Sequence, residues 1–131
     1  MELFKKQEEI CRELGNRDGL QRSLGNQAAN LQKWGKLDEA MELFKEQERI
    51  CRELGIMEGL AVALCNQAAL LGFTLRKTGE ALPMAREAQE IATRYGLKSL
   101  TNGISDLVMR LEAKSYVRRS RKERPRRRKG S

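Results

Sequence analysis

The sequence predicts an all-α protein in which about six helices stack as repeated pairs. The first reason is repetition, because about 20 of the first 30 positions recur 40 residues later. The second is periodicity, because apolar residues in each copy are spaced three or four positions apart, as on one face of a helix. The third is composition, because good helix formers dominate and the two prolines and few β-branched residues leave little material for a sheet.

The repeat is visible in continuous stretches of identical residues. Met1–Lys5 recurs as Met41–Lys45, and Ile10–Gly15 recurs as Ile50–Gly55. A third, weaker copy runs through Ile91–Gly96 and is displaced by one residue. Each copy contains two helices, which we call A-type and B-type. We expect B-type helices over 1–15, 37–54 and 79–95, and A-type helices over 18–34, 58–75 and 98–114.

Glycines and small residues fit this order. Gly15, Gly55 and Gly96 follow the B-type helices, where a left-handed cap is favoured, and Gly35 and Gly79 suit the turns that follow the A-type helices. Buried alanines at repeated positions would let neighbouring helices approach closely. The expected small positions are Ala28, Ala68, Ala40 and Ala81, and Val108 takes the place of Ala28 and Ala68 in the last A-type helix.

These residues resemble the tetratricopeptide repeat. The stretch Leu24–Leu31, followed by Gly35–Ala40 and Phe44, matches its pattern of small, large, Gly, Ala and Phe positions. The length of about 40 residues is similar to the repeats of the Pins/LGN adaptors and the kinesin light chains. The resemblance covers 1–114 and implies a right-handed α-α superhelix that binds a protein or peptide in a concave groove lined by A-type helices. Gln47 departs from the pattern, since the family usually has Ala there.

Amide side chains at repeated A-type positions are the groove candidates that the resemblance implies. Asn26 and Asn66 recur at one repeat position, and Asp106 takes that place in the third copy. An Asn side chain offers one donor group and one acceptor, which match a peptide unit. The alternative is that these residues cap or bridge neighbouring helices, and the two interpretations have equal weight. Further candidates are Asn30, Gln27 and Gln67.

The positive charge is concentrated in the last 17 residues. Residues 115–131 hold nine Lys/Arg and one Glu, which leaves 26 − 9 = 17 basic and 18 − 1 = 17 acidic residues in the rest of the +8 chain. We expect this segment to be a disordered tail that binds polyanions through Arg118, Arg119, Arg121, Lys122, Arg124, Arg126, Arg127, Arg128 and Lys129. A solubilising terminus is the alternative. A nuclear address is a third reading, in a eukaryote.

Other classes of protein have little support in the sequence. There is no His, no Gly-rich phosphate loop and no Ser motif on a sharp turn, so we expect no enzyme, no metal site and no cofactor. The three cysteines are expected to be reduced and packed. With no long apolar run, we expect a cytoplasmic protein without a membrane partner. The leading function is therefore a protein-interaction scaffold, and the rival is a nucleic-acid accessory protein whose tail provides the affinity.

The order of helices also suggests self-association. The chain begins with a B-type helix and finishes with an A-type helix, so each end lacks the type found at the other. If Phe4 on the first helix and the stripe Leu100, Ile104, Val108 and Leu111 on the last were both exposed, copies would join head to tail. A two-fold dimer through one end, or a monomer whose ends are covered, are the alternatives.

Overall fold

The computed structural model describes the backbone of residues 1–123 and the side chains of residues 1–121. The described residues form helices joined by short turns and contain no strand, so the all-α class and the number of six helices are confirmed. The helices are α1 (Glu2–Leu14), α2 (Arg17–Lys33), α3 (Leu37–Leu54), α4 (Met57–Ala69) with the short π-helical segment η1 (Leu70–Thr74), α5 (Thr78–Arg94) and α6 (Lys98–Glu123). Most bounds lie within three residues of those that the periodicity predicts.

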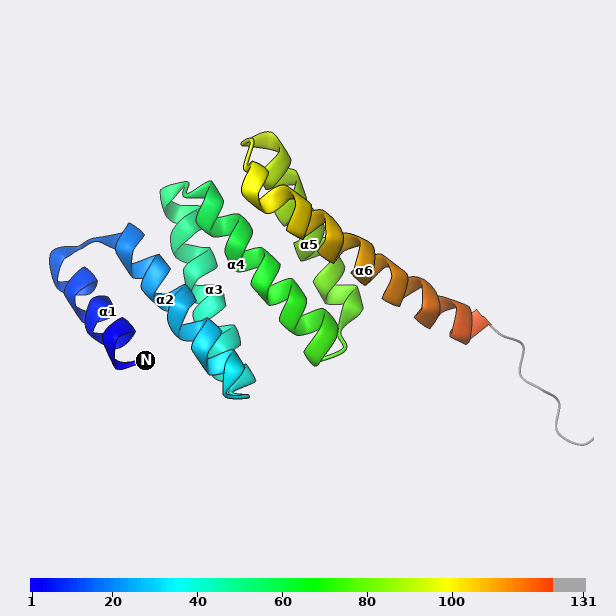
Figure 1. Cartoon of the computed structure of the whole chain (residues 1–131), viewed down its shortest axis with the longest axis horizontal. Coiled ribbons are helices and arrows are strands. Elements are labelled where there is room, and N and C mark those ends of the chain that lie inside the picture. Colours follow the sequence, from blue (N-terminus) through cyan, green and yellow to red (C-terminus); the bar gives the residue numbers. More distant parts are fainter. Residues whose placement is uncertain (124–131) are drawn as a thin grey trace, which may run out of the picture.

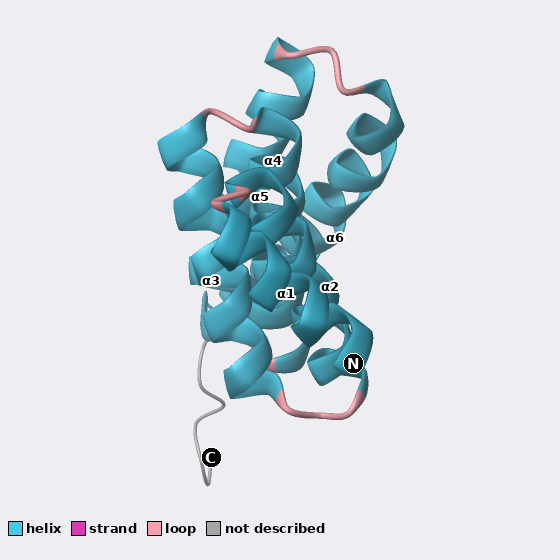
Figure 2. Cartoon of the chain, turned by 90° about the vertical axis from the view of Figure 1, so that its left-hand side faces the viewer, coloured by secondary structure: helices cyan, strands magenta, loops and turns pink. Residues whose placement is uncertain are grey.

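Each helix packs against the next along the chain, and α4 also contacts both α2 and α6. Figure 1 shows the A-type helices α2, α4 and α6 in front, with the B-type helices α3 and α5 behind them. Figure 2 looks along the row of helices from the α1 end. The core is thus built from pair after pair in sequence order.

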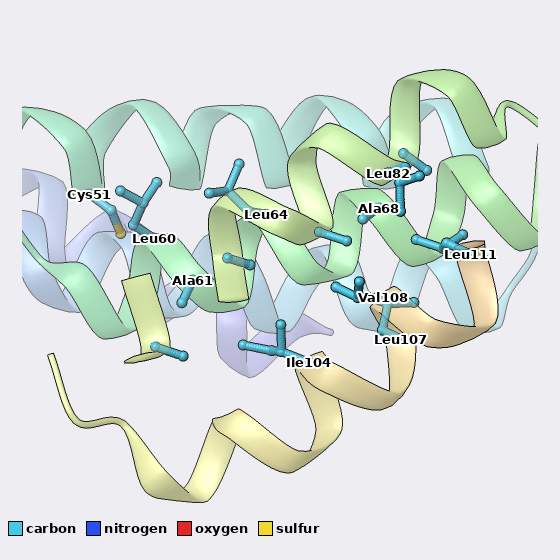
Figure 3. Packing of buried hydrophobic residues seen from close by; sticks show 14 residues of the cluster. Cys51, Leu60, Ala61, Leu64, Ala68, Leu82, Ile104, Leu107, Val108 and Leu111 are labelled. Carbon is cyan, nitrogen blue, oxygen red and sulfur yellow. The ribbon is translucent and has the colours of Figure 1, made fainter. Parts of the chain in front are cut away.

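The largest buried cluster lies between α4, α5 and α6 (Figure 3). The predicted stripe of α6 contributes Ile104, Val108 and Leu111, which are at most 4% exposed. The expected small positions are confirmed, because Ala28, Ala68, Ala40 and Ala81 are all fully buried. Small side chains at these points let the helix axes approach closely while Leu and Phe44 fill the space around them.

An inserted residue separates the third pair of helices from the first two. The left-handed cap residues Gly15 and Gly55 are 40 positions apart, whereas Gly55 and Gly96 are 41 apart, with φ angles of 66°, 70° and 64°. The extra residue falls in η1, where Leu75 N–H bonds to the carbonyl of Leu70, five residues back, at 3.0 Å. A π-helical turn holds one more residue than an α-helical turn, so η1 absorbs the insertion.

The turn after η1 differs from the one that we expected. Gly35 has a φ of 76°, as predicted, but Gly79 lies inside α5. Arg76 takes the corresponding place, with a φ of 56°, and no other non-glycine residue in the described chain has a positive φ. A side chain in this conformation costs roughly 1–2 kcal/mol. The second A-to-B turn is therefore strained where the first is relaxed.

The insertion also changes which face α6 presents. Counted from the helix starts, Met109 rather than Val108 occupies the place of Ala28 and Ala68, and it is 68% exposed. Its neighbours on that face are mainly polar, Thr101, Asn102, Ser105 and Glu112. The apolar stripe points inward instead. The expectation that this stripe is exposed at the array end was wrong, because α6 turns its polar face outward.

The two ends of the protein therefore differ. Helix α1 keeps an apolar surface with Leu3, Ile10 and Leu14 at 81%, 51% and 76% exposure. Helix α6 has lost the small residue that close packing of a further helix requires. We had expected an exposed apolar surface on α6 to support head-to-tail continuation of the array, and α6 does not present one.

Helix α6 continues past residue 114, where we expected the tail to begin. Residues 115–123 contain no Gly or Pro and are rich in Arg and Lys, which are good helix formers. Adding residues to an existing packed helix avoids the cost of nucleation. The expectation of disorder over 115–123 was therefore wrong, whereas residues 124–131 lie outside the described part of the chain.

Among the residues that the structure describes, one segment, Met57–Thr74, is long and apolar enough to cross a membrane by length and composition, with a mean hydropathy of 1.2. Half of this segment is buried inside the protein. It packs between α3 and α5, so its apolar character matches its place in the core.

A pair of glycine substitutions tests the packing of η1 against α6. A Cβ at Gly72 would overlap the fully buried Leu111 side chain, so Gly72→Ala should lower the free energy of unfolding by about 1–3 kcal/mol. Gly103→Ala on α6 is the control, because a Cβ there meets no atom within 4 Å and should stabilise the helix by about 0.5–1 kcal/mol. Urea unfolding followed by circular dichroism measures both. Equal stability of the two variants would contradict this packing.

Candidate functional site

A groove of about 680 Å³ lies between the A-type helices α2 and α4. Its walls come from three repeat-related pairs of residues, Asp18 and Glu58, Arg22 and Val62, and Asn26 and Asn66. Within each helix these residues are four positions apart, so they form one continuous row along the helix face. Because the two helices stack in the same direction, the rows face the groove at matching heights.

Asn26 and Asn66 both lie on this groove, as the sequence predicts. Asn26 is exposed and Asn66 is half-buried. Neither side chain makes a side-chain hydrogen bond to another of the described residues. Their amide groups are available to a ligand, and the alternative role as helix caps is not seen, since the cap of α2 is Asn16.

Two buried glutamines form the polar floor of the groove. Gln21 Nε2 donates to Asp18 Oδ1 at 3.1 Å, and Gln47 Nε2 donates to Gln21 Oε1 at 3.0 Å. The Cys51 thiol lies 3.4 Å from the same Gln21 oxygen. Gln47 Oε1 is buried and accepts no hydrogen bond within the described structure. An unsatisfied buried acceptor costs about 1–3 kcal/mol, so it is an unusual feature of a folded core.

Glycines make room for this floor. A Cβ at Gly25 would lie 2.8 Å from Gln47 Nε2, and a Cβ at Gly59 would lie 2.8 Å from Gln21 Oε1. No Cβ normally approaches a heavy atom so closely. The two glycines therefore leave room for the glutamines in these positions, and a side chain at either glycine would force the glutamine ends to shift.

At the next interface, between α4 and α5, the equivalent positions carry no amide side chains. There Ala61 replaces Gln21, Cys65 replaces Gly25 and Ala88 replaces Gln47. Ala61 and Ala88 are fully buried in the large apolar cluster. The fold therefore does not need a polar floor, and the interface beside the groove carries one at a cost in stability.

Gln27 and Gln67 are not groove residues, which corrects the expectation from the sequence. Both are buried, and they donate to Glu8 Oε1 at 2.7 Å and Glu48 Oε1 at 2.8 Å. These two bonds are the same interaction, repeated 40 residues apart, between an A-type helix and the B-type helix before it. The side chains point away from the groove because position 27 lies on the opposite side of α2 from the row that ends at Asn26.

Each of these glutamates belongs to a short ion-pair chain. Arg12 bonds to Glu8 and to Glu46, both at 3.2 Å. Arg52 repeats this arrangement with Glu48 at 2.9 Å and Glu87 at 2.8 Å. These ion pairs connect successive B-type helices along the surface, so their role is to join repeats.

Two other candidates also fall outside the groove. Asp106 is exposed on α6, and the residue at the place of Asn26 and Asn66 is the buried Leu107, because of the inserted residue in η1. Asn30 is half-buried on α2 and does not line the groove. The pair of Asn residues therefore does not extend to a third repeat.

The basic candidates lie at the far end of the molecule. Arg118 and Arg121 line a second hollow beside η1, and Arg119 lies on α6 with its guanidinium 3.4 Å from Ser115 Oγ. The backbone of Lys122 is helical. The remaining candidates, Arg124, Arg126, Arg127, Arg128 and Lys129, lie outside the described residues.

The cysteines are free thiols. Burial raises the pKa of the Cys51 thiol to about 11, with a smaller contribution from the charge of Asp18. Burial also raises the pKa of Cys65. Both thiols stay protonated at neutral pH, so neither is a ready nucleophile or metal ligand. Within the described side chains no group of three His, Cys, Asp or Glu residues is placed to hold a metal ion.

Substitutions in the floor test whether the polar groups are needed for stability. Gln21→Ala alone leaves the Gln47 amide without partners and should lower the free energy of unfolding by about 1–3 kcal/mol. The triple variant Gln21→Ala, Gly25→Cys, Gln47→Ala copies the second interface and should return to within about 1 kcal/mol of the wild type. Chemical denaturation compares them. A triple variant less stable than the single one would show that the polar floor is structural.

No protein-family model, curated protein or solved structure matches this chain. The role of the groove therefore has to be inferred from its own residues. These are two repeat-related Asn side chains above a buried, incompletely bonded polar floor.

Proposed function

We propose that the protein is a non-enzymatic interaction module of the tetratricopeptide type, whose α2–α4 groove binds an extended peptide segment of a partner protein. In this proposal the helix pairs form a right-handed superhelix, and α2, α4 and α6 line its concave side. The resemblance in the sequence and the pairwise packing of helices in chain order both support that arrangement.

The observation that carries the proposal is the buried Gln47 Oε1 at the floor of a groove flanked by Asn26 and Asn66. A peptide backbone presents an N–H donor and a carbonyl acceptor at each residue. Gln47 offers an acceptor, and each Asn offers both kinds of group. An extended main chain laid along the groove can bond to both Asn side chains without contributing any particular side chain, and the buried Gln47 Oε1 joins them once its side chain turns toward the groove.

Charge at the other end of the groove favours one kind of peptide. Asp18 and Glu58 place two carboxylates there, and Arg22 pairs with Asp18 at 2.5 Å. A basic side chain of the peptide would therefore gain from a position beside Glu58. Arg22 and Val62 occupy the same repeat position but have different side chains. At this position the two walls can therefore discriminate among peptide sequences.

The experiment selects ligands first and then removes the proposed contacts. Peptides are selected from a random displayed library on the full chain, and their affinities are measured by fluorescence anisotropy. Replacing Asn26 and Asn66 together with Ala should weaken binding by about 5- to 150-fold, since two hydrogen-bonding side chains are worth roughly 1–3 kcal/mol. The helical circular dichroism signal and melting temperature should stay close to those of the wild type, because both side chains project into the groove.

Asn102→Ala is the matched control, because Asn102 is an exposed amide on the outer face of α6. This variant should bind the selected peptides as the wild type does. If the double variant also binds them with unchanged affinity, the groove is not the binding site. If the double variant unfolds, the two Asn residues are structural and the proposal fails.

A further inference from the structure

A second hollow, of about 820 Å³, lies between η1 and the last turns of α6. It exists because α6, with 26 residues, is much longer than the 17-residue α5 on which it packs. The protruding turns of α6 face the loop after η1 (Figure 1). This hollow is separate from the α2–α4 groove and shares no lining residue with it.

The rim of this hollow is strongly basic. Arg76 comes from the loop, and Lys114, Arg118 and Arg121 come from successive turns of α6. No acidic side chain is among the lining residues. Four positive charges that converge on one hollow from two elements create a strong attraction for anions.

The backbone of Arg76 supports a role for this rim beyond solubility. Its left-handed conformation is the one that Gly35 adopts at the same place in the first repeat. A glycine would relieve the strain, and arginine is present instead. Strained residues of this kind tend to occur at functional sites, where the position of the side chain matters.

The floor of the hollow is apolar and contains an aromatic ring. Phe73 is half-buried, and Ala113 and Val117 lie beside it. The Arg110 guanidinium carbon and Lys114 Nζ lie 4.7 Å and 5.1 Å from the centre of the Phe73 ring. These cation–π contacts fix the ring and hold the positive charge of Lys114 at the edge of the apolar floor.

A basic rim around an aromatic floor fits single-stranded nucleic acid. Phosphates of the strand would contact the cations, and an unpaired base would pack against Phe73 and Val117. A duplex keeps its bases stacked inside and cannot use the floor. An acidic peptide would use the rim as well, but the charge favours a longer polyanion, because nine of the 17 residues from 115 onward are Lys or Arg.

We propose that the hollow formed by η1 and the end of α6 is a binding site for single-stranded nucleic acid, with phosphates held by Arg76, Lys114, Arg118 and Arg121 and a base packed on Phe73. Affinity then has two parts. The structured hollow distinguishes single strands from duplexes, and the Arg-rich sequence beyond it adds attraction without sequence preference. This site is independent of the peptide groove, so either function can fail without the other.

The test keeps the full chain, so that the C-terminal residues contribute equally to every variant. A short fluorescein-labelled oligothymidylate is titrated with each protein over a range of salt concentrations. Arg76→Gly with Arg118→Gln should weaken binding by about tenfold or more, since two charge-assisted contacts are lost. The slope of log affinity against log salt should fall by about 1.4, at roughly 0.7 per phosphate contact.

Arg76→Gly alone separates binding from stability. It removes one charge and also restores the residue that relaxes the turn, so it should weaken oligothymidylate binding while leaving the melting temperature unchanged or higher. Phe73→Leu removes the aromatic ring and no charge. It should weaken single-strand binding without changing the salt slope, and it should leave binding to a duplex unaffected.

Lys33→Gln with Lys45→Gln is the control for the loss of two charges, because both lysines are exposed and lie on α2 and α3, outside the hollow. The proposal is overturned if this control weakens binding as much as the variants in the hollow do. It is also overturned if those variants bind oligothymidylate as the wild type does. If polyglutamate displaces the oligonucleotide as well as unlabelled oligothymidylate does at equal charge, the site is for an acidic protein segment instead.

Discussion

Each interior helix of this protein has to bury two faces at once, one against the helix before it and one against the helix after it. Fully buried alanines at Ala28, Ala68, Ala40 and Ala81 make this possible, because they let four helices approach closely from both sides. The sequence must then repeat at a nearly fixed spacing, or the wrong face would turn inward. A helix at the end of the row packs against a neighbouring helix on one side only. The other side of α6 can therefore expose a polar face.

This constraint explains why a single inserted residue has large effects. The π-helical turn of η1 keeps α5 in place against α4, yet every later residue is one position out of step with the first two repeats. Met109 therefore lies where a small residue would be needed, and Leu107 lies where Asn26 and Asn66 have their amides. The insertion both turns a mainly polar face of α6 outward and limits the Asn pair to the α2–α4 groove.

The sequence was sufficient for the class, the number of helices and most helix bounds, because the 40-residue repetition and the apolar spacing record the two-faced burial directly. It was insufficient where one residue decides the outcome. The displacement of the third copy was visible, but periodicity did not show that η1 absorbs it, so Asp106 was aligned one residue too early. The length of α6 was missed, because a charged segment with no apolar pattern can still extend a helix that is already packed.

The candidate site was also predictable only in part from the repeated positions. Repetition pointed to Asn26 and Asn66, but Gln27 and Gln67 repeat equally well and serve the contact between helices instead. Repetition shows that a position matters to the array and does not say on which side of the helix it acts. The polar floor had a different signal, since Gln47 stands where the tetratricopeptide pattern has Ala and its partners are absent from the next interface.

The α2–α4 groove is proposed to hold an extended main chain, and the side-chain amides of the groove report on this most directly. In a nitrogen–proton correlation NMR spectrum of the labelled full chain, a selected peptide should shift the side-chain NH₂ signals of Asn26, Asn66 and Gln47 together. The signals of Gln27 and Gln67 should stay in place, because these side chains contact Glu8 on α1 and Glu48 on α3, away from the groove. Shifts confined to α1 or to the end of α6, with the three groove amides unchanged, would contradict the account.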